Sequence, residues 1–143
     1  MIHLKAFAIG AALALAATGA WAETLHFAAT LKGADETPPN DSAGTGRVTA
    51  TLDTGSKVFK YKVDYSGLTG PAKAAHFHGP AAPGADAPPV VPVPANDLAN
   101  PMRGSATLTD EQIGQLEGGQ WYFNIHTAAH GGGEVRGQVE EQK

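Results

Sequence analysis

The feature that most constrains the fold is an alternation of apolar and polar residues with a period of two. It is clearest over residues 59–65, where aromatic and branched side chains alternate with Lys60, Lys62 and Asp64. Successive side chains of a strand point to opposite faces, so this segment predicts a strand with one buried face and one wet face. An aromatic face opposite a lysine-rich face is typical of an antiparallel sheet.

Shorter alternations predict further strands over residues 25–31, 47–52, 121–125 and 135–139, with a weaker one over residues 104–108. A single short helix is predicted where Thr109 and Gln112 form a capping box ahead of Ile113 and Leu116, and Gly118 and Gly119 end it. The pattern is typical of a β-sandwich or small barrel. We therefore expect an all-β antiparallel fold of about seven strands with one short helix.

The region from residue 80 to residue 101 holds seven of the ten prolines. Because proline cannot donate a backbone hydrogen bond, regular internal pairing is not expected there. Val90 and Val91 are candidates for a short strand at a sheet edge, where proline is tolerated. A ligand for a proline-recognition domain is the functional alternative, and we favour a semi-rigid extended loop.

The N-terminus has the organisation of a signal peptide. A short basic region precedes an apolar run over residues 6–17, and Ala20-Trp21-Ala22 supplies a cleavage site. The apolar run is too short for a spanning helix, which needs about 20 residues. We predict a signal peptide over residues 1–22, one domain over residues 23–143, and a periplasmic or secreted protein; an uncleaved N-terminal anchor is the alternative.

Composition narrows the range of partners. The formal net charge is −4 at pH 7 and there is no cysteine. A mildly acidic chain is not expected to bind nucleic acid, or a membrane once the signal is cleaved, because both select clustered Lys and Arg. The lack of cysteine excludes disulfides and thiolate metal sites. A protein or matrix partner is compatible with the composition, and the oligomeric state is left open.

Four of the six histidines lie in two strand-like segments, as His76, His78, His126 and His130. In both segments the strand histidines fall on the face opposite the apolar residues. If the two strands are neighbours, the imidazoles converge within cross-strand reach, which suits copper or zinc. The alternative is a set of surface histidines that hydrogen-bond to loops. His26 is expected to be structural, and His3 leaves with the signal.

Two carboxylates are candidates for a further ligand or for a hydrogen-bond acceptor behind an imidazole. They are Glu36, beside a Pro-Pro pair, and Glu134, for which Arg136 is a candidate ion-pair partner. No nucleophile with a base partner, phosphate loop or dinucleotide fingerprint is present. We therefore predict no catalytic residues, and an enzyme is the less favoured class.

Three segments together resemble the signatures of the CHRD domain, a family first described in chordin and found in exported bacterial proteins. They are residues 31–39 (LKGADETPP), residues 76–81 (HFHGPA), and residues 124–127 (NIHT) with 134–138 (EVRGQ). Gly131 departs from the family, which more often has proline there. The resemblance implies an exported all-β domain that folds as an immunoglobulin-like, Greek-key antiparallel β-sandwich. It implies no established activity or functional residues.

A weaker resemblance is to copper/zinc superoxide dismutase, another Greek-key sandwich with a His-x-His strand. His76 and His78 resemble its first copper-ligand pair, and His126 resembles its late-strand ligand. The disulfide and the zinc-binding loop are missing, and Arg136 is only a loose candidate for the guide arginine. Three hypotheses follow: a metal-binding module, a structural or adhesive module without metal, and a copper redox enzyme.

Overall fold

The computed structural model describes residues 12–14 and 19–143. Most of the predicted signal peptide lies outside these residues, and β1 begins just beyond the predicted cleavage site. Within the described residues no helix has the length and apolar character needed to cross a membrane.

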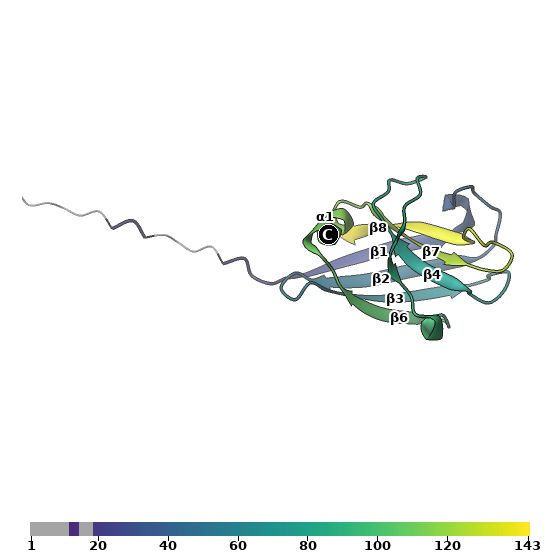
Figure 1. The fold of residues 1–143 in the computed structure, drawn as a ribbon, viewed down its shortest axis with the longest axis horizontal. Coiled ribbons are helices and arrows are strands. Elements are labelled where there is room, and N and C mark those ends of the chain that lie inside the picture. Colours follow the sequence, from purple (N-terminus) through teal and green to yellow (C-terminus); the bar gives the residue numbers. More distant parts are fainter. Residues whose placement is uncertain (1–11, 15–18) are drawn as a thin grey trace, which may run out of the picture.

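The described chain forms one antiparallel sheet of eight strands with a single α-helix (Figure 1). The strands follow the spatial order β5-β4-β7-β8-β1-β2-β3-β6. Their bounds in chain order are β1 Thr24–Lys32, β2 Thr45–Asp53, β3 Val58–Ser66, β4 Ala74–His78, β5 Pro89–Pro92, β6 Met102–Thr107, β7 Trp121–His126 and β8 Val135–Gln142. Short 3-10 turns, η1 at Gly33–Asp35 and η2 at Ala95–Asp97, and the helix α1 at Asp110–Glu117 fill the connections.

The all-β prediction is confirmed, with two corrections. There are eight strands rather than about seven, because Val90 and Val91 form the edge strand β5 and complete the sheet beside β4. Hydrogen bonds between β8 and β1 also join all eight strands into one sheet rather than two separate ones.

Strand β8 is the corner of this curled sheet. Residues 135–139 pair with β7, and residues 140–142 together with Arg136 pair with β1. The corner needs glycine at position 137, because a Cβ atom there would overlap the backbone carbonyl of Thr30 on β1. The close approach of the two backbones lets the halves of the sheet fold over one core.

Aromatic side chains fill the space between the two halves. Phe59 on β3 lies edge-on to Phe77 of β4, with ring centroids 5.1 Å apart, and to Trp121 of β7, at 5.9 Å. All three are fully buried. The alternation that buries Phe77 also turns its neighbours His76 and His78 to the other face of β4, so core packing fixes where the histidines point.

The predicted helix is confirmed as α1. The Thr109 side chain accepts a hydrogen bond from the Gln112 backbone, the Gln112 side chain accepts one from the Thr109 backbone, and Gly118 is the C-cap. Leu116 is buried in the core. Gln115 accepts a hydrogen bond of 3.1 Å from Trp121 Nε1, so the helix also fixes the start of β7.

Candidate metal centre

Strands β4 and β7 are direct neighbours, which sequence alone leaves open. In their antiparallel register His76 lies opposite Asn124, and His126 lies opposite Ala74. The ring centroids of His76 and His126 are 5.1 Å apart, and those of His76 and His78 are 5.3 Å apart. One ligand nitrogen from each of the three imidazoles lies within 4.8 Å of the other two. The structure thus brings together three of the four predicted histidines.

His126 is held by the turn that follows its strand. Its Nδ1 lies 3.0 Å from the backbone carbonyl of Gly131, which can only accept a hydrogen bond, so Nδ1 carries the proton. Its Nε2 is buried and has no hydrogen-bond partner. An imidazole that donates one N–H to a carbonyl and leaves the other nitrogen free has the arrangement typical of a metal ligand.

His76 supplies a second unpartnered nitrogen. Its Nδ1 is buried and makes no hydrogen bond to any described residue. Leaving a buried polar atom unpaired costs about 1–3 kcal/mol, so two such atoms at one place need an explanation. A cation coordinated by His76 Nδ1 and His126 Nε2 would satisfy both nitrogens, and the donor set therefore fits a metal.

His78 differs because both of its ring nitrogens have partners. Nδ1 lies 2.8 Å from the carbonyl of Ala87, and Nε2 lies 2.9 Å from the side-chain Oδ1 of Asn124. A neutral ring that donates from Nδ1 presents a lone pair at Nε2, which requires the Asn124 amide to present its NH₂ group instead of its oxygen. His78 Nε2 can therefore join a metal only when Asn124 releases it.

A stack of three groups fixes the orientation of His78. Its ring lies parallel to that of Tyr122, with centroids 4.6 Å apart and planes 5° apart. The guanidinium carbon of Arg136 lies 3.5 Å from the centroid of the Tyr122 ring. The hydroxyl of Tyr122 also hydrogen-bonds to the backbone of Ala87, which is the residue that holds His78 Nδ1.

The predicted ion pair between Arg136 and Glu134 is wrong. Arg136 is buried and donates to Asp86, at 3.0 Å, and to Ala85 and Thr37. Although Glu134 is only two residues away, it lies in the bend before β8, and the loop that contains Ala85 and Asp86 supplies acceptors to Arg136 instead. Arg136 thus holds the loop that carries Ala87, and its guanidinium is not available as a guide for an anion at the histidines.

The electrostatic surroundings of His76 and His78 favour the neutral forms of these two imidazoles. Burial lowers the pKa of His76, and the charges of His126 and His78 lower it further. Burial also lowers the pKa of His78, against the opposing effect of its hydrogen bonds to Ala87 and Asn124. Neutral imidazole is the form that binds metals, so both shifts favour ligation near neutral pH.

Glu36 lies beside Asn124, outside the three-histidine cluster. It is 4% exposed, and its Oε1 is buried without a hydrogen-bond partner. Burial raises the pKa of Glu36 to about 7, although the nearby Arg136 and the Thr37 N–H oppose the shift. Glu36 and Asn124 meet over Gly133, where a Cβ atom would overlap both side chains. Asn124 thus separates Glu36 from His78.

Glu134 organises loops and does not reach the histidine cluster. This fully buried carboxylate accepts hydrogen bonds from the backbone and hydroxyl of Thr69, from Thr127 and from Ser42. Burial alone would raise the pKa of Glu134, but these hydrogen bonds outweigh it and lower the pKa. The carboxylate therefore ties together the loops after β3, before β2 and after β7.

His130 lies in the turn between β7 and β8, apart from the three converging imidazoles. Its Nε2 is 4.0 Å from Glu134 Oε1, and its backbone N–H and carbonyl both bond to Thr127. His26 is exposed on β1 and lies on a different part of the sheet. The glycine-rich turn thus contributes the carbonyl of Gly131 to the site rather than an imidazole.

Sequence reasoning did not assign roles to Asn124, Tyr122 or the carbonyl of Ala87. The alternation places Asn124 and Tyr122 on the histidine face, so their proximity to the site was accessible from the pattern. The Ala87 carbonyl comes from a proline-rich loop without periodicity, and no sequence signal indicates where such a loop packs.

These features define an all-β domain with three imidazoles gathered on the outer face of two neighbouring strands. The sequence matches the family model of the CHRD domain over residues 27–139. The chain therefore belongs to the CHRD domain family, and the predicted resemblance is confirmed. Comparison with curated proteins gave no match, and neither did comparison with solved structures.

Proposed function

We propose that this chain is an exported CHRD-type binding module that takes up one zinc or copper ion through His76, His78 and His126. The observation that carries the proposal is the pair of buried, unpartnered nitrogens, His76 Nδ1 and His126 Nε2, in a group whose ligand atoms lie within 4.8 Å of one another. Export is part of the proposal and rests on the N-terminal sequence and the family.

The donor set favours zinc and copper over harder cations. Three neutral nitrogen ligands suit Zn²⁺ and Cu²⁺, whereas Mg²⁺ and Ca²⁺ select oxygen ligands. Three protein ligands also leave one coordination position for water or for a group from a partner. Glu36 lies beside Asn124 at Gly133, and Asn124 in turn contacts His78.

The test is calorimetric titration of the purified protein with Zn(II) and with Cu(II). We expect one ion per chain, a rise in melting temperature with metal, and loss of both in His76→Ala and in His126→Ala. His26→Ala is the matched control, since it removes an exposed histidine from outside the cluster. His130→Ala tests the fourth predicted histidine, and we expect it to bind normally because its ring lies against Glu134.

The second candidate is a structural or adhesive module in which the histidines hold loops. The contacts of both His78 ring nitrogens, Nδ1 with the Ala87 carbonyl and Nε2 with the Asn124 side chain, favour it. It predicts a melting temperature that does not respond to either metal and falls in His78→Ala. A metal-dependent rise that disappears in His126→Ala would exclude it.

A further inference from the structure

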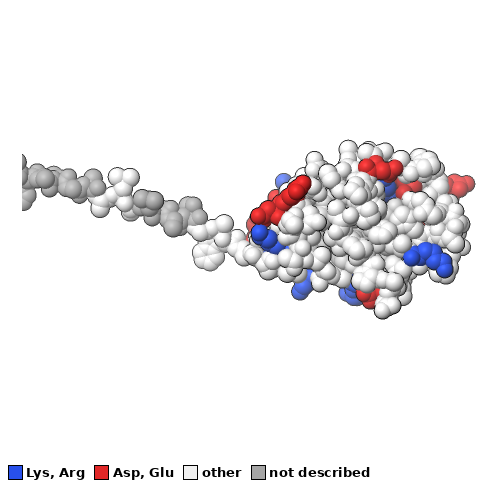
Figure 2. All heavy atoms as spheres, in the orientation of Figure 1, with Lys and Arg blue, Asp and Glu red and all other residues white. Residues whose placement is uncertain are grey.

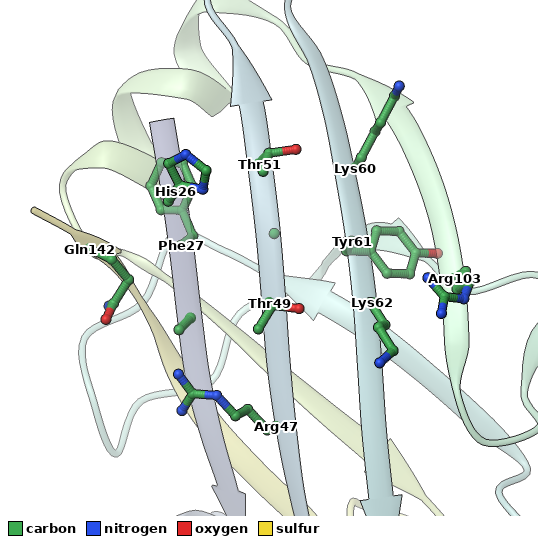
Figure 3. A pocket seen from close by; sticks show the side chains of 12 residues that line it. His26, Phe27, Arg47, Thr49, Thr51, Lys60, Tyr61, Lys62, Arg103 and Gln142 are labelled. Carbon is green, nitrogen blue, oxygen red and sulfur yellow. The ribbon is translucent and has the colours of Figure 1, made fainter. Parts of the chain in front are cut away.

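The outer face of β2, β3 and β6 carries a group of cationic side chains. Arg47 lies on β2, Lys60 and Lys62 on β3, and Arg103 on β6, all on the face opposite the core (Figure 3). They surround a shallow hollow of about 380 Å³ whose floor includes Thr49 and Thr51. We call these four cations and two threonines the basic face.

Three of these four cations form no ion pair with any described residue, although Asp64 lies opposite Arg47 in the β2–β3 register. Lys62 pairs with Asp64 at 3.1 Å, but within residues 12–14 and 19–143 no carboxylate lies within 4.0 Å of Arg47, Lys60 or Arg103. Lys62 also lies directly opposite Arg103 in the β3–β6 register. Like charges in facing positions destabilise a sheet, so this arrangement costs stability.

The basic face contrasts with the rest of the molecule. The chain has a formal net charge of −4, yet four of its ten Lys and Arg residues gather here. On the face drawn in Figure 2 the charged side chains are few and lie mainly toward the rim. The concentration of cations on one side would attract an anionic partner to that side.

The surroundings of the cations select the kind of anion. Single-stranded nucleic acid is held by successive bases stacking on several exposed aromatic rings. Phe27 and Tyr61 line the hollow but are only 2% and 5% exposed, so His26 is the one exposed ring among its lining residues. A membrane surface is met by apolar side chains, and the large exposed ones in the described chain are Leu13 and Trp21, outside the hollow. Hydroxyls beside the cations, from Thr49 and Thr51, suit a ligand that carries both anionic groups and hydroxyls.

We propose that the basic face binds an anionic polysaccharide. Carboxylate or sulfate groups of the glycan pair with Arg47, Lys60 and Arg103, and the threonine hydroxyls bond to sugar hydroxyls. Along a strand, residues two apart are separated by about 6.6 Å, and neighbouring strands lie about 4.8 Å apart, so the cations present a two-dimensional array to a repeating polyanion. This site is independent of the histidine cluster, which lies on β4 and β7.

Binding to immobilised dextran sulfate and to polygalacturonate, with uncharged dextran as the reference, tests the proposal and separates sulfate from carboxylate recognition. We expect binding to at least one charged glycan and none to dextran, with affinity falling at least about tenfold between roughly 50 and 200 mM salt. The variant Arg47→Gln/Lys60→Gln/Arg103→Gln should lose at least about tenfold in affinity. Its matched control, Lys57→Gln/Lys73→Gln/Lys143→Gln, carries the same net charge and should bind as the native chain does.

Equal losses in the two triple variants would overturn the proposal, because net charge and not the basic face would then control binding. Binding to neither charged glycan would overturn it as well. Tighter binding to single-stranded DNA than to either glycan at matched salt would overturn the choice of ligand. The variant His76→Ala tests whether glycan binding is independent of the metal site. It should leave glycan affinity unchanged whether or not the native chain binds metal. The melting temperature of each variant shows that it is folded.

Discussion

Asn124 and His78 are joined by a contact of 2.9 Å between the amide Oδ1 and the imidazole Nε2, across the neighbouring strands β7 and β4. The contact occupies the nitrogen that His78 would offer to a metal, while the corresponding nitrogens of His76 and His126 are free. Asn124 therefore competes with a metal ion for His78, and the strength of that competition can be measured.

Asn124→Ala should tighten metal binding. The variant leaves His78 Nε2 without a partner, so coordination no longer requires a hydrogen bond to break. A hydrogen bond contributes about 1 kcal/mol, so we expect the Kd for Zn(II) to fall about fivefold, and the metal-free protein to lose about 1 kcal/mol of stability. Calorimetry and urea unfolding measure the two effects. Asn100→Ala, whose side chain bonds to Tyr65 far from the site, is the control, and weaker zinc binding in Asn124→Ala would contradict the prediction.

Glu36 should make stability depend on pH. Burial raises the pKa of its carboxyl from 4.5 to about 7, so the folded state holds this proton more tightly than the unfolded chain does. The stabilisation is complete below pH 4.5 and is lost as pH rises through about 7, with an upper limit of about 3 kcal/mol. The pKa values of His76 and His78 are lowered instead. These two residues therefore make stability fall as pH drops below their ordinary pKa of 6.5.

Comparison with Glu36→Gln isolates the effect of the Glu36 carboxyl on stability. The native chain and the variant both contain the histidines, so the contribution of the histidines is the same in each. Urea unfolding between about pH 5 and pH 8 should show the native chain losing more stability with rising pH than Glu36→Gln does. Parallel curves for the two proteins would show that Glu36 has an ordinary pKa.

Glu134→Gln should destabilise the protein with little change in shape. The carboxylate oxygens accept from Thr69, Thr127 and Ser42, and the NH₂ group of glutamine would face these donors. The variant loses buried hydrogen bonds to a charged group and leaves their donors unpaired. We therefore expect the free energy of unfolding, measured with urea, to fall by about 2–4 kcal/mol. The exposed Glu140→Gln, on the adjoining strand segment, is the control and should change stability by less than about 0.5 kcal/mol.

Arg103→Thr should stabilise the protein while weakening glycan binding. It removes the positive charge that faces Lys62 across the β3–β6 ladder and places a β-branched residue on the strand. We expect a gain of about 0.5 kcal/mol in thermal or urea unfolding. Because Arg103 is one of the three cations proposed to bind glycan, affinity should fall in the same variant. A loss of stability would mean that Arg103 contributes packing that outweighs the repulsion.

The alternation of the sequence predicted much of this fold. It placed Phe77, Phe123 and Ile125 inside and the histidines outside, because strand geometry alone forces that division. The helix at Thr109 was equally accessible, since a capping box is a local hydrogen-bonding unit. The edge strand at Val90 and Val91 was indicated as well, although its contribution to the strand count was missed.

The candidate site was predicted only in part, because its assembly is not local. The alternation put His76 and His126 on outer faces, but only the sheet order makes β4 and β7 neighbours and brings the rings to 5.1 Å. His130 was grouped with them on sequence proximity, and the turn instead presents the Gly131 carbonyl to His126. Arg136 was predicted to pair with Glu134 because of their spacing in the sequence. In the structure Arg136 pairs with Asp86, which lies on a loop far away in the chain.

By itself, the sequence determined which residues form strands, which side of each strand meets the core, and the family to which the chain belongs. These properties depend on the period of the backbone and on short motifs, which act over a few residues. The tertiary structure decided which imidazoles converge, which nitrogens stay unpaired, and where the cations of β2, β3 and β6 collect into one face. Those outcomes depend on strand order, register and loop packing, which are set by contacts between residues far apart in the chain.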